Sequence, residues 1–130
     1  MINGFEEQTE PLTEYEEQQL LPQIIRGLSL KVGKENAVTN GAIVRGMKAN
    51  LNLRTTEPRV RKIINHIRTN DLVPCLIATS QGYYIAESEQ ELKDYEESLL
   101  GREEAIRSVR LSIQRQRTLK YHHQQQELFP

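Results

Sequence analysis

Within residues 38–86 the spacing of apolar residues changes from a helical to a strand-like pattern, and this order constrains the fold more than any other feature. Thr39 or Asn40 is placed to cap a first helix, and Thr55 or Thr56 to cap a second. The apolar residues of these helices recur at spacings of three and four: Ala42, Ile43, Met47 and Leu51, then Val60, Ile63, Ile64 and Ile67. The pattern predicts two helices joined by a short turn and followed by strands.

The strand-like part predicts a tight hairpin. An apolar run over 75–78 forms the first strand, 80–82 is a turn signal, and 83–86 returns as the second strand. Residues 37–38 are placed to add a short strand beside the hairpin. We expect Cys75 to be a small, buried strand residue.

This order is typical of a winged helix-turn-helix. The sequence therefore predicts an α+β protein, with three helices and a β-hairpin wing, followed by a long C-terminal helix. We divide the chain into a flexible acidic N-terminus (1–12), the winged domain (13–87), a long helix (88–122) and a flexible tail (123–130). Leu51 and Leu53 are expected to lie buried beneath the turn between the two helices.

The first helix is predicted from Glu14 to about Lys31. Thr13 and Glu16 have the spacing of a capping box. Pro22 either kinks this helix or marks a later start. The acidic part, residues 14–19, is expected to project from the core.

The long C-terminal helix begins with a second capping box, Ser88 with Glu91. Its apolar residues form a partial heptad seam, in which Leu92, Leu99, Ile106 and Ile113 recur every seven residues. Tyr95 lies three residues after Leu92, and Val109 lies three residues after Ile106. The seam can join two subunits into a homodimer through residues 89–116, or pack back onto the winged domain. The sequence leaves both alternatives open.

Charge is separated along the chain although the net charge is only −1. Residues 1–22 hold six acidic and no basic side chains, whereas residues 23–86 hold ten Lys/Arg against three Asp/Glu. Residues 87–104 hold eight acidic and two basic side chains, and residues 105–130 hold one acidic and five basic ones. The positive charge therefore coincides with the predicted helix-turn-helix.

The second helix of the helix-turn-helix carries the strongest functional signal. Cations neutralise phosphates, and Arg and Asn can read base edges in the major groove. The candidate double-stranded DNA contacts on this helix are Arg59, Arg61, Lys62, Asn65, His66 and Arg68. Further candidates are Arg45, Lys48 and Arg54 beside the groove, and Ser80 and Gln81 at the wing tip. The alternative is an ordinary solvated helix face, and the DNA hypothesis requires these cations to point at solvent.

The last residues place an apolar pair in a polar tail. The spacing of Gln125, Leu128 and Phe129 resembles the short motif by which bacterial proteins dock on the replication sliding clamp. The alternative is that Leu128 and Phe129 fold back onto the long helix.

Catalysis finds little support in the sequence. It has no Gly-rich phosphate loop, its histidines lack ligand spacing, and its one cysteine excludes an internal disulfide and a four-cysteine zinc site. We expect no enzyme activity and no cofactor. The single cysteine, the acidic N-terminus and the lack of a long apolar run indicate a cytoplasmic protein without a membrane span.

Three segments resemble winged-helix proteins encoded by bacteriophages and prophages: residues 60–71, the hairpin over 76–88 and the helix from Glu89 onward. The resemblance implies a role in phage or mobile-element replication or transcription regulation. The predicted function is sequence-dependent or non-specific double-stranded DNA binding. The alternative is a protein-interaction adaptor in which the first helix and the Leu-Phe tail recruit partners.

Overall fold

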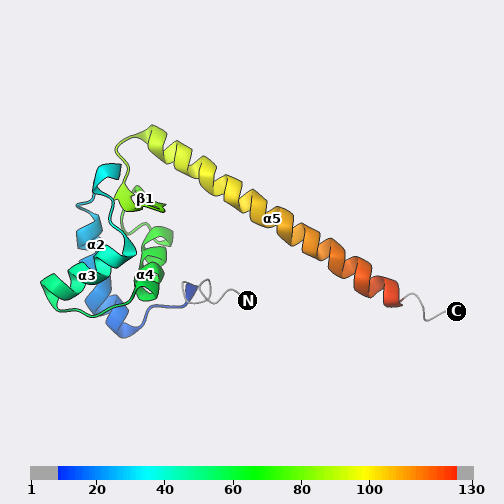
Figure 1. The fold of residues 1–130 in the computed structure, drawn as a ribbon, viewed down its shortest axis with the longest axis horizontal. Coiled ribbons are helices and arrows are strands. Elements are labelled where there is room, and N and C mark those ends of the chain that lie inside the picture. The colour runs from blue at the N-terminus through cyan, green and yellow to red at the C-terminus, as the bar shows by residue number, and fades with distance from the viewer. Residues whose placement is uncertain (1–8, 126–130) are drawn as a thin grey trace. The chain divides into compact units, whose positions relative to one another are not determined.

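The computed structural model describes the backbone of residues 9–125 and the side chains of residues 9–122. It separates into two compact units, Met1–Leu92 and Lys93–Pro130. The elements in chain order are a π-helical turn η1 (Glu16–Leu20), α2 (Leu21–Leu28), a 3-10 turn η2 (Lys34–Asn36), α3 (Asn40–Leu51), α4 (Glu57–Thr69), β1 (Leu76–Thr79), β2 (Gly82–Ile85) and α5 (Glu89–Gln125) (Figure 1). The α+β class and the long C-terminal helix are as the sequence predicts.

Helices α3 and α4 begin at the residues that their caps predict. Thr39 Oγ1 accepts from the Ala42 amide at 3.1 Å, and Thr56 Oγ1 accepts from the Arg59 amide at 3.4 Å. Each cap satisfies a backbone donor in a first turn that has no partner within the helix. Pro58 lies in the first turn of α4, where no amide hydrogen is needed.

Strands β1 and β2 form an antiparallel hairpin in which Leu76 pairs with Ile85 and Thr79 with Gly82. The pairing expected beside the hairpin is present as an isolated bridge and not as a strand: Val38 and Tyr83 exchange backbone hydrogen bonds of 2.8 and 3.0 Å. The sequence did not predict a second bridge, in which Val32 lies parallel to Ile85.

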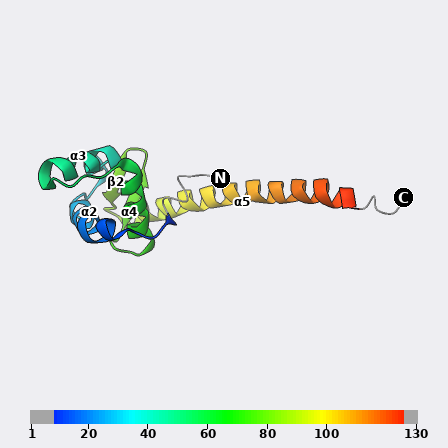
Figure 2. The same ribbon diagram turned by 90° about the horizontal axis from the view of Figure 1, so that it is seen from below.

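The core of the first unit lies between α2, α4 and the hairpin, which gather together in Figure 2. Its buried residues are Leu20, Ile24, Leu28, Met47, Val60, Ile63, Ile64, Ile67, Val73, Leu76 and Tyr83. All four apolar residues predicted for the inner face of α4 are among them. This burial fixes which side of α4 faces outward.

The N-terminal helix differs from the prediction. The helix follows Thr13, but it passes through the π-helical turn before α2, and the Leu21 amide donates to the Glu16 carbonyl five residues earlier. Pro22 then stands in the first turn of α2, which needs no amide from it. The expectation that residues 14–19 project from the core is wrong for Glu16, which is buried.

Two apolar positions were also placed wrongly. Leu51 is exposed because Asn52 turns the chain into the left-handed conformation directly after it, whereas Leu53 is partly buried against the core. Cys75 is exposed and has a φ of 64°, so it lies in a turn before β1 and not in the strand.

In the second unit, α5 continues to Gln125. Ser88 Oγ accepts from the Glu91 amide at 3.2 Å at the helix start, as predicted. No helix within residues 9–125 has the length and apolar character needed to cross a bilayer.

Candidate nucleic-acid interface

Helix α4 carries most of the predicted DNA contacts, and the structure divides them into two sets. Residues three, four or seven apart lie on one side of a helix. Arg59, Lys62 and His66 therefore share one flank of α4, and Arg61, Asn65 and Arg68 share the other. The first of these flanks meets the N-terminal helix through Arg59 and Lys62.

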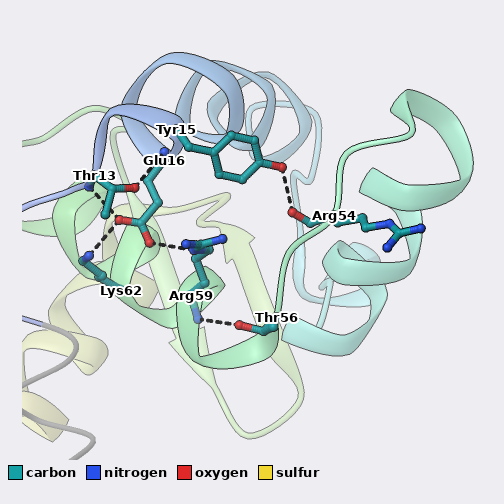
Figure 3. Close-up of polar contacts among 7 residues, drawn as sticks. All are labelled: Thr13, Tyr15, Glu16, Arg54, Thr56, Arg59 and Lys62. Atoms are coloured by element: carbon teal, nitrogen blue, oxygen red, sulfur yellow. Dashed lines mark hydrogen bonds and ion pairs between the residues drawn. The ribbon is translucent and has the colours of Figure 1, made fainter.

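The carboxylate of Glu16 binds two cations of α4 (Figure 3). Lys62 Nζ lies 2.7 Å from Glu16 Oε1, and Arg59 Nε lies 3.0 Å from Glu16 Oε2. The side chains of Glu16 and Lys62 are only 3% and 10% exposed, whereas that of Arg59 is 39% exposed. We call these three residues the Glu16 clamp.

Residues beside the clamp hold it in place. The Thr13 amide donates to Glu16 Oε1 at 2.8 Å, and the Glu16 amide donates to Thr13 Oγ1 at 3.2 Å, which confirms the predicted capping box. The guanidinium of Arg59 lies 5.4 Å from the centre of the Tyr15 ring, within cation–π range. The Tyr15 hydroxyl donates to the Arg54 carbonyl at 2.7 Å and so ties the N-terminal helix to the α3–α4 turn (Figure 3).

The pKa of the Glu16 carboxyl reflects opposing effects. Burial is the largest single effect and raises it, but the hydrogen bonds from Lys62 and Thr13 and the charge of Lys62 together outweigh burial. The net result is a pKa below the ordinary value of 4.5. Glu16 is therefore held as an anion, which is what two neighbouring cations require.

The clamp corrects the predicted interface. The expectation that Lys62 points at solvent is wrong, because its ammonium group is buried against Glu16. Arg59 keeps partial exposure, but its guanidinium is committed to the same carboxylate. Sequence spacing did not predict this ion pair, because Glu16 lies 46 residues before Lys62. The capping box with Thr13 had already explained Glu16 as a local helix cap.

The other flank of α4 remains a candidate surface. Arg61, Asn65 and Arg68 are all partly exposed, and their spacing of four and three places them in one row. Within the described residues Arg61 has no ion-pair partner. We call these three residues the outer row.

His66 lies at the other side of α4 and is partly exposed. Its Nδ1 is 3.4 Å from Asn70 Nδ2, and the same amide group donates to the His66 carbonyl at 2.9 Å. These contacts place His66 in the closing turn of the helix.

The remaining candidates lie on α3, the α3–α4 turn and the hairpin. Arg45, Lys48 and Arg54 are exposed, as are Ser80 and Gln81 at the hairpin turn. The Gln81 amide donates to Thr79 Oγ1 at 3.1 Å, which organises the turn. All five are accessible to a ligand.

The tail candidates cannot be placed in the same way. The backbone of Gln125 ends α5, and its side chain lies outside the described residues. Leu128 and Phe129 also lie outside them.

A cavity of about 560 Å³ lies between α2 and α3, and no sequence motif predicted it. Its lining is mainly apolar and includes Ile24, Leu28, Leu30, Val38, Ile43, Met47 and Leu51. The cavity is partly open to solvent.

The described residues contain no group of three or more His, Cys, Asp or Glu side chains that could hold a metal ion. Searches of protein-family models, curated proteins and solved structures found no match to this chain. The proposals below therefore depend on the geometry and on the residues alone.

Proposed function

We propose that the first unit is a winged helix-turn-helix domain that binds double-stranded DNA through the outer row of α4. In this assignment α3 and α4 form the helix-turn-helix, and β1 with β2 forms the wing. The observation that carries the proposal is the orientation of α4. Its inner face is buried, so the opposite flank presents two Arg and one Asn as partly exposed groups.

Charge near the outer row supports the same ligand. Arg45, Lys48 and Arg54 are exposed on α3 and in the turn after it, where they can neutralise phosphates. With Arg61 and Arg68 they make five cations that the Glu16 clamp does not engage. The proposed process is phage or mobile-element replication or transcription regulation, as the resemblance of the helix and hairpin sequences implies.

The Glu16 clamp changes which substitutions can test the proposal. Lys62→Ala would leave the buried Glu16 carboxylate short of a partner, and the resulting loss of stability would imitate a loss of DNA contact. Arg61→Ala with Arg68→Ala removes two cations from the outer row and leaves the clamp intact. Arg107→Ala with Arg115→Ala removes the same charge from exposed positions of α5 and is the matched control.

The measurement is fluorescence anisotropy of a labelled random-sequence duplex at low and moderate salt. We expect the outer-row variant to bind about tenfold more weakly or worse, and its plot of log affinity against log salt to flatten by about two units of slope. The α5 control should bind within about twofold of the parent. Equal binding by the outer-row variant and the parent would contradict the proposal.

The second candidate function is a protein-interaction adaptor. Two observations favour it: the clamp withdraws two cations from α4, and the mainly apolar cavity between α2 and α3 is open. In this alternative the N-terminal helix and the Gln125–Leu128–Phe129 tail recruit partners, of which a replication sliding clamp is one. A parent protein that binds no duplex even at low salt would favour the adaptor.

A further inference from the structure

Helix α5 leaves its apolar seam uncovered along most of its length. Ile106, Val109 and Ile113 are 70%, 64% and 57% exposed, and Leu99 is also exposed. The seam from Leu92 to Gln116 extends for about 36 Å at 1.5 Å per residue. A surface of this kind is typical of a helix that pairs with another helix.

The charge along α5 indicates which partner fits. Residues 89–104 hold seven acidic and two basic side chains, and residues 105–125 hold five basic and no acidic ones. The two halves therefore carry −5 and +5. A second copy of α5 running in the opposite direction would bring each acidic half beside a basic half, whereas a parallel copy would bring like charges together.

The seam itself disfavours a parallel pair. Arg102 occupies a seam position, three residues after Leu99. In a parallel pair two Arg102 side chains would face each other, and burying like charges together is costly. In an antiparallel pair with Ile106 opposite Val109 of the second copy, Arg102 instead lies opposite an aliphatic residue, Ile113.

The residues that flank the seam select the register. Four residues after Leu92, Leu99, Ile106 and Ile113 stand, in that order, Glu96, Glu103, Arg110 and Arg117. In the antiparallel register centred on Ile106 and Val109, Glu103 lies beside Arg110 of the second copy and Glu96 beside Arg117. A shift of one heptad in either direction would instead bring Glu103 beside Glu103, or Arg110 beside Arg110.

Between residues 92 and 119 the other flank carries no charge. Its residues are Ser98, Ala105, Ser112 and Leu119, and the first three are small enough for two helices to approach closely. Charge pairing therefore comes from one flank alone. All four flanking charged residues are exposed, so they are placed to pair between chains.

We propose that α5 forms an antiparallel coiled coil with α5 of a second copy of this chain, in the register that pairs Glu103 with Arg110 and Glu96 with Arg117. The pairing places the N-terminal ends of the two α5 helices at opposite ends of the coil. The proposal does not depend on DNA binding.

Sedimentation equilibrium of the full chain tests the pairing. Glu96→Arg with Glu103→Arg converts four attractive pairs into four repulsive ones, and we expect the dimer dissociation constant to rise on the order of a hundredfold. Adding Arg110→Glu and Arg117→Glu reverses every pair and should restore the parent's dissociation constant. Glu97→Arg with Glu104→Arg makes the same charge change on the side away from the seam and is the control.

Spin labels distinguish the two orientations. In a Cys75→Ser background, a label at Glu97→Cys and one at Ser108→Cys are each measured against the same position of the second copy by double electron–electron resonance. The antiparallel register separates the two 97 positions by about 32 Å along the axis and the two 108 positions by about 2 Å. A parallel pair would give similar distances at both positions.

The outcomes each decide the proposal. The proposal is supported if Glu96→Arg with Glu103→Arg weakens the dimer, the four-residue variant restores it, and the two label distances are unequal. Three results would overturn it: a monomer at every concentration, a dimer dissociation constant that the charge reversals do not change, or equal label distances.

Discussion

The carboxylate of Glu16 makes both a local interaction and long-range interactions. It caps its own helix through Thr13 and pairs with Lys62 and Arg59 on α4. The ammonium of Lys62 is buried, so it depends on this carboxylate to compensate for the water it has lost. The pairing joins the N-terminal helix to α4 and removes two cations from the surface that the sequence predicted for DNA.

Glu16→Ala should therefore destabilise the first unit more than a surface substitution does. Removing one partner of a buried ion pair leaves the other charge uncompensated, and we expect a loss of about 3 kcal/mol in the free energy of unfolding. Urea denaturation followed by circular dichroism measures it. Glu17→Ala changes an exposed neighbour and should stay within about 0.5 kcal/mol of the parent, so equal losses in the two variants would contradict a structural role for the clamp.

The lowered pKa of Glu16 predicts a pH dependence with a definite sign. A carboxyl whose pKa is lower in the folded state contributes stability above its ordinary value of 4.5, and this contribution is lost as the pH falls through the folded-state pKa. The difference in unfolding free energy between the parent and Glu16→Gln should therefore be largest at neutral pH and shrink in acid. Denaturation curves at a series of pH values measure it, with Glu17→Gln as the control. A difference that stays constant into acid would refute the assignment.

At the scale of elements, the hairpin comes close to the chain before α3 at Gly82. Gly82 has a φ of 123°, and a Cβ placed there would lie 2.5 Å from the Val38 carbonyl oxygen. The Val38–Tyr83 pairing brings these backbones together, so a side chain at Gly82 cannot be accommodated without moving one of them. The position of the hairpin thus depends on a missing side chain.

Gly82→Ala should cost about 3 kcal/mol in the free energy of unfolding, because both its backbone conformation and the space around it disfavour a side chain. Gly46→Ala is the matched control. It makes the same chemical change inside α3, where nothing lies within 4 Å of the added Cβ, and should stabilise the unit by up to about 1 kcal/mol. Thermal denaturation distinguishes the two variants. Changes of the same sign would show that the close approach does not govern stability.

For the whole molecule, charge is distributed differently in the two units. The block over residues 23–86 carries an excess of seven positive charges, and the clamp brings Glu16, from outside that block, against two of its cations. In α5, the charge is divided lengthwise into an acidic and a basic half. The low net charge therefore conceals a positive block within the first unit and a lengthwise separation of charge in α5.

Local patterns determined the elements of this protein. Thr39, Thr56 and Ser88 cap helices because a side-chain oxygen satisfies nearby backbone donors, an effect confined to one turn. The apolar periodicity of α4 identified its buried face for the same local reason, since residues three and four apart lie together on any helix. The left-handed backbone that exposes Leu51 and Cys75 was not evident from their apolar character.

Tertiary structure alone decided which of the outward groups remain available. Arg59 and Arg61 are the same residue type and lie two residues apart. Of the two, Arg59 forms the ion pair with Glu16, because the N-terminal helix packs on the flank of α4 that carries Arg59. An ion pair across 46 residues has no periodicity from which to predict it, since its geometry follows from the packing of both helices on a shared core. The sequence therefore determined the helices, the hairpin and the buried face, and the packing determined which charges face solvent.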